Sequence, residues 1–357
     1  MNVFIVFTGR FTQLSIVVGY LTSFGSEKMR AYWQDVLKSI YGISAELTRL
    51  NGEYDLNFFA KGDDGKNHIL KVMHVGCDVQ LVDMQCKALH QIKKFAPGFP
   101  APFLVPIPDG RGYASMPDAA GVMRHIWVMT ALDGVSYADF KPHSLSLIEF
   151  LGRQIGLLDK ALEQFAHPYL ERDFKWNLTK AGWIRPKITV LTNPGRKAMV
   201  SEVISDFEAL EPELAALPKH AIHNDINDYN ILVRGSLTGM HEVSGLIDFG
   251  DMVTAPRVCE IAIAGAYVVL DHEEPENALA ALVAGYHSVH PISAAEIDMI
   301  YPLLRMRLAV SVVNSTLMAE QTPDDPYVTI SQAPAWRFLE GQKIDAGLMR
   351  ARLRCAC

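Results

Sequence analysis

The stretch 221–251 holds the residue types that can do chemistry together. It opens with His223, Asp225 and Asn230 in the pattern H-x-D-x-x-x-x-N, which runs into a short apolar segment. A second apolar segment ends in D-F-G-D, whose first residue is Asp248. Short apolar runs bounded by polar turns predict strands. These two strands would bring an acidic loop and an acidic turn to the same place.

Phosphoryl transfer requires this set of groups. A carboxylate must accept the proton of the attacking hydroxyl, and we assign that role to Asp225. A hard cation such as Mg²⁺ bridges the phosphates through oxygen ligands, which Asn230 and Asp248 supply. Protein kinases use H-R-D-x-x-x-x-N and D-F-G, and Asn224 stands here in place of that Arg, which favours a kinase of small molecules. The alternative is a polar turn followed by an unrelated Asp-Phe-Gly.

A lysine upstream fits the same chemistry. Lys71 lies in the apolar run HILKVM, which predicts a strand, and a buried charge needs an anionic partner. We therefore predict that Lys71 binds nucleotide phosphates; the alternative is a lysine on a solvated edge. The following helix, expected over 83–95, carries Gln85 where kinases place an acid that pairs with the lysine. This departure leaves the partner of Lys71 open.

Composition bounds the class of protein. A chain of 357 residues predicts two domains or one two-lobed domain. The net charge of −7 comes without a basic run, so we expect no nucleic-acid partner. The five scattered cysteines show neither a disulfide framework nor zinc-ligand spacing, which suits a reducing cytoplasm. We expect Cys355 and Cys357 to lie in a frayed tail.

Periodicity predicts an α/β part up to Leu132 and a mostly helical part beyond it. Gly152 and Gly156, four residues apart, would permit close helix packing. Glu260 is the lone acid of an apolar helix and a candidate brace for the catalytic loop or for His223. The expected helices are 27–41, 83–95, 144–162, 200–217, 257–270, 277–287 and 301–317, and the expected strands lie within 47–59, 68–73 and 124–132, with N-caps at Ser144 and at the capping box Ser293–Glu296.

Two stretches allow more than one interpretation. Residues 1–25 are largely apolar and β-branched but fit neither a signal peptide nor a membrane helix well, so we expect a non-core extension and no membrane partner; a membrane anchor is the alternative. The run Arg172, Asp173, Phe174, Lys175, Trp176 combines charges with aromatic rings, and either lines a substrate pocket or covers the surface. Arg305 and Arg307 are further candidates for binding a substrate carboxylate.

The two motifs together resemble the aminoglycoside phosphotransferase and choline kinase family, over about 27–319. The longer strings IHNDINDYNILV, GLIDFGDMVTAPRVCEIAIA and RDFKWNL are most similar to the hydroxylysine kinases and the related kinase domains fused to class III aminotransferases. The resemblance implies an α+β, bilobal, protein-kinase-like fold: an extension over 1–26, a small β-rich N-lobe over 27–132 and a larger, mostly helical C-lobe over 133–357.

The resemblance also implies site residues. Asp225 would be the base, Asn230 and Asp248 the magnesium ligands, and Lys71 the phosphate lysine. The backbone of 129–132, with Met129 and Ala131, would form the hinge that meets the base of ATP or GTP. The implied acceptor is the hydroxyl of an amino-bearing small molecule, with 5-hydroxy-L-lysine the leading candidate. Aminoglycosides, choline or ethanolamine are alternative acceptors, and a catalytically silent nucleotide-binding scaffold is a further alternative.

Overall fold

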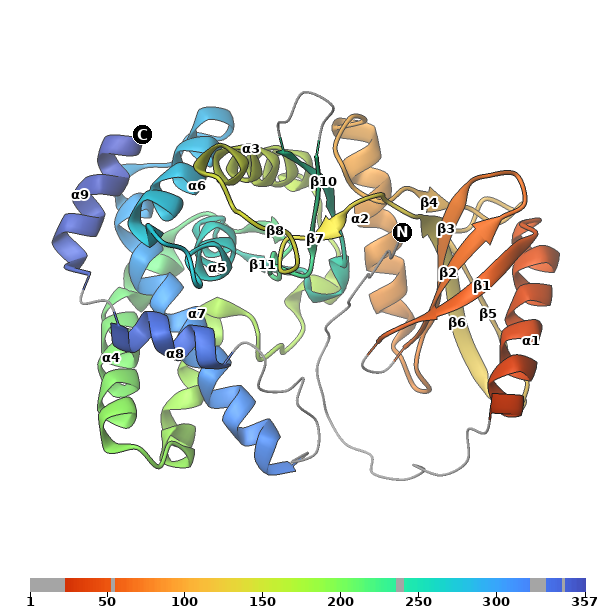
Figure 1. The fold of residues 1–357 in the computed structure, drawn as a ribbon, viewed down its shortest axis with the longest axis horizontal. Coiled ribbons are helices and arrows are strands. Elements are labelled where there is room, and N and C mark those ends of the chain that lie inside the picture. Colours follow the sequence, from red (N-terminus) through yellow and green to blue (C-terminus); the bar gives the residue numbers. More distant parts are fainter. Residues whose placement is uncertain (1–22, 53–54, 236–240, 322–331, 342–343) are drawn as a thin grey trace. The chain divides into compact units, whose positions relative to one another are not determined.

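The computed structural model describes residues 23–52, 55–235, 241–321, 332–341 and 344–357 (Figure 1). The chain divides into two compact units. Unit 1 takes the chain up to Asp139 together with 229–234 and 244–250, and unit 2 takes the remainder. The expected N-terminal extension falls almost wholly outside the described residues.

Unit 1 is built on an antiparallel sheet of six strands. The strand order is β1-β2-β3-β6-β4, and β5 also pairs with β6. The tight connection after β2 sets Lys61 opposite Asn67. The strands are β1 (Ala45–Leu50), β2 (Leu56–Gly62), β3 (Asn67–Val72), β4 (Leu104–Val105), β5 (Tyr113–Pro117) and β6 (Met123–Thr130).

One helix covers each face of this sheet (Figure 1). Trp33 and Leu37 of α1 (Ser23–Tyr41) pack with Leu70 and Val72 of β3 in one buried apolar cluster. Because side chains alternate along a strand, Lys71 points to the opposite face, the side of α2 (Val79–Phe95). The lysine is therefore buried away from the main apolar cluster of unit 1.

A second sheet has three strands in the order β10-β9-β7: β7 (Val135–Ser136), β9 (Ile231–Gly235) and β10 (His241–Leu246). Val135 pairs with Val233. The predicted strands on either side of the acidic loop and turn are therefore neighbours in the structure.

Unit 2 is mostly helical. Its central helix, α5, is buried on nearly all sides, which explains its almost wholly apolar sequence. Strands β8 (His220–Ile222) and β11 (Val253–Ala255) pair antiparallel on either side of the motif stretch. The helices are α3 (Leu145–Leu162), α4 (Pro194–Ala216), α5 (Val258–Val268), α6 (Pro275–Val289), α7 (Ala294–Gln321), α8 (Gln332–Gly341) and α9 (Ala346–Ala356), with 3₁₀ segments η1 (Pro168–Glu171) and η2 (Leu178–Val190), and η3 (Phe249–Asp251) at the boundary with unit 1.

Close packing of α3 on α6 confirms the interpretation of the glycine pair. A Cβ on Gly152 would lie 2.0 Å from Leu282 O, and one on Gly156 would lie 3.1 Å from Tyr286 O. Gly285 of α6 is in equally close contact with α3, because a Cβ on Gly285 would lie 1.9 Å from Glu149 O. No side chain fits between the two backbones at these points.

The predicted helix starts are confirmed by their caps. Ser144 Oγ accepts from Leu147 N at 3.2 Å at the start of α3. Ser293 N donates to Glu296 Oε2 at 2.8 Å and Glu296 N donates back to Ser293 Oγ at 3.3 Å, which is a capping box.

The expectation of a frayed tail is wrong for Cys355, which lies in the last turn of α9 (Ala346–Ala356). Met349 and Leu353 of this helix are buried, while Cys355 and Cys357 are exposed. Among the described residues, no helix is both long and apolar enough to cross a membrane.

Candidate active site

The carboxylate of Asp225 is held in unit 2 by two side chains. Arg307 Nη2 donates to its Oδ1 at 2.8 Å, and Asn227 Nδ2 donates to its Oδ2 at 2.9 Å. Asp225 and Arg307 are 6% and 3% exposed. Burial lowers the pKa of Arg307, but Tyr267 and Asp225 more than compensate, so its pKa stays above the usual value. Arg307 is therefore a fixed cation beside the predicted base.

The loop that carries Asp225 is anchored from below by Glu260 of α5. Glu260 accepts the backbone N–H of His223 and, at 3.0 Å, that of Asn224. Burial raises the pKa of Glu260 well above its usual range, as does nearby Asp159, while the two N–H groups act in the opposite direction. His223 is fully buried, and its Nδ1 accepts from Asp225 N at 3.3 Å. Glu260 of α5 and His223 of the loop thus fix the backbone of the loop that carries Asp225.

Asn224 explains why this loop departs from the kinase pattern. Its φ is 66°, a left-handed conformation that Asn tolerates better than most residues. Its Nδ2 donates to Asp251 O at 3.1 Å and to Trp176 O at 3.4 Å. The residue therefore ties the catalytic loop to the 172–176 segment and to the chain beyond the second motif.

The two predicted metal ligands come together within unit 1. Asn230 directly precedes β9, Asp248 follows β10, and Ile247 N donates to Asn230 O at 3.0 Å. Asp248 also has a φ of 66°, and its Oδ1 accepts from Gly250 N at 3.4 Å. A carboxylate and an amide from adjacent strand ends form a hard-oxygen donor set that fits Mg²⁺.

Lys71 finds its partner on the same turn. Its Nζ lies 3.5 Å from Asp248 Oδ1 and 5.7 Å from the centre of the Trp127 ring. Gln85 Nε2 instead donates to Leu81 O at 3.3 Å within α2. Gln85 Oε1 would lie 3.8 Å from a Cβ on Gly250, so Gln85 lies next to the D-F-G-D turn. The open question of the lysine's partner is answered by Asp248.

Asp55, which directly precedes β2, is also fixed near this lysine. Asp55 Oδ1 accepts from His74 N at 2.8 Å and from His74 Nδ1 at 3.1 Å. Burial raises the pKa of Asp55, but the hydrogen bond from His74 and the charge of Lys71 together lower it by more, so the pKa of Asp55 is below the usual value. Asp55 is a second carboxylate in the electrostatic field of Lys71.

The predicted hinge residues lie at the end of β6. Met129 pairs with Ile69 of β3 and with Leu104 of β4. Ala131 N donates to Asn67 O at 3.0 Å. The role of this backbone in binding a purine stays a prediction.

The first two residues of the charged and aromatic segment contact groups other than Asp225. Arg172 donates to Met252 O at 2.6 Å and stacks on Tyr169 and Phe174. The side chain of Asp173 is 98% exposed and lies 3.5 Å from Lys180. Burial lowers the pKa of Arg172. Arg172 holds the 252 loop, and Asp173 faces solvent.

The last two residues of the segment do approach Asp225. The Arg307 guanidinium lies 4.7 Å above the Trp176 ring, and Lys175 Nζ lies 5.9 Å from the same ring. Lys175 Nζ also donates to Asn314 Oδ1 at 3.1 Å. Arg305, by contrast, pairs with Asp206 at 3.1 Å on the surface. Lys175, Trp176 and Arg307 therefore form one cluster with the predicted base.

Sequence reasoning missed three members of this cluster: Asn227, Tyr267 and Asn314. Arg307, Ser311 and Asn314 recur at i, i+4 and i+7 on α7, and all three are buried. A buried polar row on an otherwise apolar helix was visible in the sequence as a signal. Tyr267 and Asn227 offered no comparable pattern.

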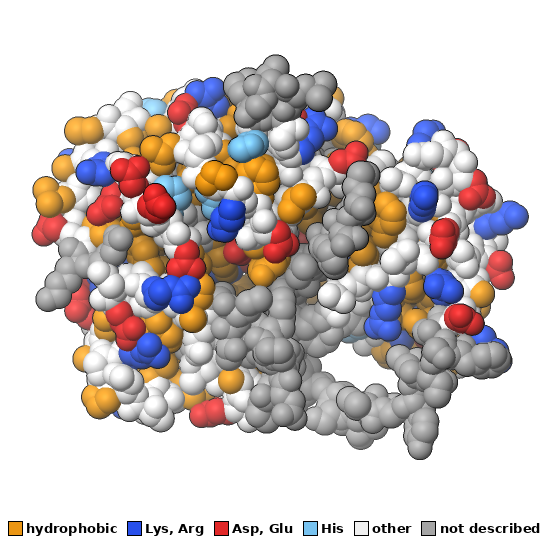
Figure 2. Space-filling model, viewed as in Figure 1, with side chains coloured by type: hydrophobic (Ala, Val, Ile, Leu, Met, Phe, Trp, Pro, Cys, Tyr) orange, Lys and Arg blue, Asp and Glu red, His pale blue; other side chains and the backbone are white. Residues whose placement is uncertain are grey.

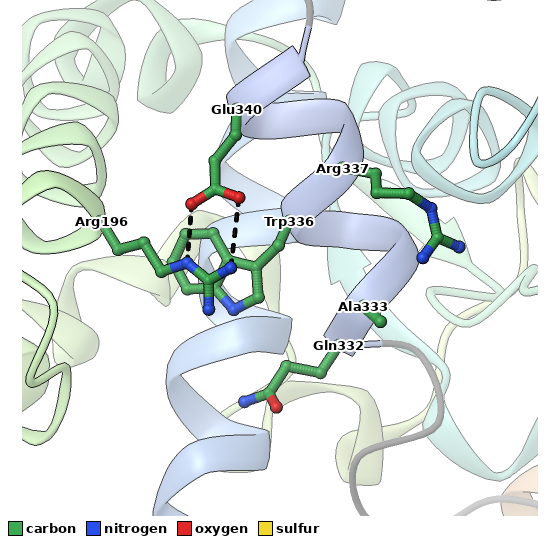
Figure 3. A pocket seen from close by; sticks show the side chains of 6 residues that line it. All are labelled: Arg196, Gln332, Ala333, Trp336, Arg337 and Glu340. Atoms are coloured by element: carbon green, nitrogen blue, oxygen red, sulfur yellow. Dashed lines mark hydrogen bonds and ion pairs between the residues drawn. The ribbon is translucent and has the colours of Figure 1, made fainter.

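A pocket of unit 2 lies apart from these residues. It has a volume of about 400 Å³ and is lined by Arg196 and by residues of α8 (Figure 3). Arg196 stacks 4.5 Å from the Trp336 ring and donates to Glu340 at 2.7 Å. No predicted site residue lines it, and its charged groups already have partners: Arg196 pairs with Glu340, and Arg337 pairs with Asp271 outside the pocket. On the face of the helical unit drawn in Figure 2, acidic and basic side chains are intermixed, without a field of one sign.

The chain belongs to the phosphotransferase enzyme family, whose model matches residues 46–297. It is 27% identical to the hydroxylysine kinase of Danio rerio over 317 residues, which cover 85% of this chain and 88% of that one. A solved microcompartment-associated aminopropanol kinase superposes with a TM-score of 0.63 at 19% identity, covering 92% of this chain and 95% of that one. The amicoumacin kinase hAmiN, solved with AMP-PNP, Ca²⁺ and its antibiotic, gives 0.64 at 16% identity, covering 91% and 99%.

These findings confirm the kinase-like fold, with a small antiparallel sheet in one unit and helices in the other. The protein is a small-molecule phosphotransferase that takes its phosphoryl group from a nucleotide and acts on a hydroxyl group.

Proposed function

We propose that this enzyme transfers the γ-phosphoryl group of ATP or GTP to the hydroxyl of an amino-bearing small molecule, with 5-hydroxy-L-lysine as the leading acceptor. The observation that carries the proposal is the buried carboxylate of Asp225, oriented by Arg307 and Asn227 at the head of the H-x-D-x-x-x-x-N loop. The similarity to hydroxylysine kinases over most of both chains supports the choice of acceptor.

In the proposed mechanism Asp225 accepts the proton of the acceptor hydroxyl as the hydroxyl oxygen attacks the γ-phosphorus. The bond between the γ-phosphorus and the β,γ-bridging oxygen breaks, and the nucleoside diphosphate leaves. Asn227 and Arg307 keep the carboxylate in one orientation, so less ordering is needed at the moment of reaction. Lys71 binds the phosphates and exchanges its pairing with Asp248 for them. Asn230 and Asp248 would hold Mg²⁺, which neutralises phosphate charge when bound.

The charges near Asp225 bear on the alternative acceptors. Arg307 and Lys175 are both cations, and a polycationic aminoglycoside would require acids at such positions. Choline and ethanolamine likewise carry a positive charge and have no anionic group that could pair with Arg307 or Lys175. The cluster therefore favours a hydroxy amino acid over either alternative, and the intact acid and amide set disfavours a silent scaffold.

A direct screen tests the proposal. Purified enzyme is incubated with Mg²⁺ and ATP or GTP in parallel, against 5-hydroxylysine, homoserine, ethanolamine, choline and kanamycin, and phosphorylated product is measured by mass spectrometry. We expect phosphorylated 5-hydroxylysine, with little product from kanamycin. Phosphorylation of the aminoglycoside or of choline alone would overturn the choice of acceptor, and absence of any product would overturn the kinase assignment of the site.

A further inference from the structure

A row of hydrogen-bond donors without acceptors lies beside the predicted base. Arg307 Nε and Nη1 and Asn314 Nδ2 are buried and have no hydrogen-bond partner among the residues that the structure describes. A buried polar group without a partner destabilises the fold, so such groups are seldom left together without a ligand or solvent to receive them. All three atoms are hydrogen-bond donors, so the partner that they lack is a hydrogen-bond acceptor.

Two residues on one face of α7 supply these donors. Arg307 and Asn314 are seven positions apart, two helical turns, with buried Ser311 between them. Arg307 also donates to Tyr267 Oη at 3.2 Å, and the oxygen of Asn314 is occupied by Lys175 at 3.1 Å. The amide orientation of Asn314 therefore follows from its bond to Lys175, which directs Nδ2 away from the lysine.

The buried donor atoms define the ligand class. The positive charges of Arg307 and Lys175 are offset by Asp225, which pairs with Arg307, and by Asp251, which also acts on Arg307. The available atoms are all hydrogen-bond donors, so the complementary group is a hydrogen-bond acceptor with several lone pairs. A carboxylate is the small group that meets this requirement and that Arg binds with the best geometry. The Trp176 ring, stacked on Arg307, supplies an apolar wall for the carbon chain of the ligand.

We propose that Arg307 and Asn314 form a carboxylate-binding subsite next to Asp225, so that the acceptor is a hydroxy acid bearing a carboxylate and not a simple amino alcohol. This inference rests on the proposed function, which it deepens by naming the group that selects the substrate. Arg307 then has two roles: it orients Asp225 through Nη2 and offers Nε and Nη1 to the acceptor.

The test compares acceptors that differ only by the carboxylate: homoserine against 3-amino-1-propanol, and 5-hydroxylysine against its decarboxylated diamine. The informative variant is Asn314→Asp, because the new carboxylate still accepts from Lys175 but replaces the donor with a negative charge. In Asn314→Asp we expect kcat/KM for the carboxylate-bearing substrate to fall about 10- to 100-fold, mainly through KM. For the matching decarboxylated substrate kcat/KM should change little. The KM of the nucleotide should not change.

A matched control comes from Asn277→Asp on α6. The Asn277 oxygen also accepts from a cation, Arg352, but it lies apart from the Asp225 cluster, so this variant should behave as the wild type. Equal losses for both acceptors in Asn314→Asp, or no loss for the carboxylate-bearing one, would overturn the subsite.

Calorimetric binding of the same compounds without nucleotide separates the two proposals. If no acceptor is phosphorylated but homoserine or 5-hydroxylysine binds the wild type and not Asn314→Asp, the subsite stands and the proposed reaction fails. If the wild type phosphorylates an amino alcohol with the same kcat/KM as its carboxylated partner, the reaction stands and the subsite fails. If the wild type binds no carboxylated compound, the subsite is refuted whatever the turnover.

Discussion

Arg307 Nη2 lies 2.8 Å from Asp225 Oδ1, and the two side chains are almost fully buried together. A buried carboxylate paired with a guanidinium keeps its charge, because the cation offsets the cost of removing it from water. The pair also fixes the direction in which the remaining lone pairs of Asp225 point. A base that must receive a proton from one particular hydroxyl benefits from both effects.

Asp225→Asn should therefore abolish most turnover. Removal of a general base costs on the order of 10²–10⁴ in rate, whereas nucleotide binding should be nearly unchanged because Asp225 is expected to touch the acceptor. Unfolding should become easier by about 1–3 kcal/mol, because Arg307 loses its charged partner. Steady-state kinetics and urea unfolding measure the two effects.

Asp228→Asn, three residues along the same loop, is the matched control and should keep turnover within a few-fold of the wild type. Asp225→Asn with turnover like that of the wild type would remove Asp225 from the role of base.

Asp248→Ala should raise the magnesium requirement and weaken nucleotide binding. The change removes one hard-oxygen ligand and also leaves Lys71, 3.5 Å away, without its carboxylate. A magnesium titration of activity and a nucleotide-binding isotherm report the change, with the exposed Asp63→Ala as the control in the same unit. A magnesium dependence identical to that of the wild type would contradict the metal-ligand assignment.

Glu260→Gln should lower kcat without altering the KM of the nucleotide. Glu260 touches no reacting atom in the proposed mechanism; it receives the N–H groups of His223 and Asn224, and an amide can serve only part of that need. We expect a loss of about 10-fold, and a larger one in Glu260→Ala, since unpaired buried N–H groups cost about 1–3 kcal/mol each. The exposed Glu211→Gln is the control. A rise in nucleotide KM with unchanged kcat would argue against a positioning role.

Local signals in the sequence predicted most of the fold. The strand around Lys71, the close helix pair marked by Gly152 and the capping box at Ser293 all depend on neighbours within one or two turns of chain, and each is present. The C-terminal helix α9 was missed because its two buried residues, Met349 and Leu353, make too short an apolar pattern to stand out. Helix α4 begins at Pro194, earlier than predicted, where Asn193 caps it.

The site was predictable only where a motif fixes the spacing. Asp225, Asn230 and Asp248 lie on one stretch whose geometry two short strands determine. The sequence could not show which side chains of the 172–176 segment are buried and which are exposed. That depends on contacts with α7, such as the hydrogen bond from Lys175 to Asn314, 139 residues further along the chain. Lys71 found its partner 177 residues away at Asp248, beyond the reach of any local pattern.

Gly152→Ala should destabilise the protein more than an ordinary surface change. Its Cβ would lie 2.0 Å from Leu282 O of α6, so the two helices must separate or distort. Overpacking of this kind typically costs about 1–3 kcal/mol or more. Thermal unfolding measures it, with Gly182→Ala as the control because the nearest atom to that Cβ would be 4.0 Å away. Equal stabilities of the two variants would show that α3 and α6 are not in close contact in solution.

Asp159 should make stability fall as the pH rises from about 4 to about 7. Burial raises the pKa of this carboxyl to about 7, although Tyr286 Oη donates to it at 2.6 Å. The unfolded chain has the usual pKa of about 3.9, so in this window the folded state holds a proton that the unfolded state has released. Unfolding therefore releases a proton there, and each increase in pH favours the unfolded state. Below about pH 4 both states are protonated, and above about pH 7 both are ionised.

Asp159→Asn removes this titration while keeping an oxygen for Tyr286. Urea unfolding at pH 5 and pH 8 should show a smaller loss of stability in the variant, by about 1–3 kcal/mol, because each unit of pKa shift corresponds to about 1.4 kcal/mol. Asp159 also raises the pKa of Glu260, so Asp159→Asn lowers that pKa and reduces the pH dependence of stability in the same direction, whereas Arg257 is unchanged in both proteins. The exposed Asp35→Asn should keep the slope of the wild type. If Asp159→Asn keeps that slope as well, Asp159 is ionised in the folded protein at neutral pH and the buried carboxyl is solvated by water that reaches the α3–α6 contact.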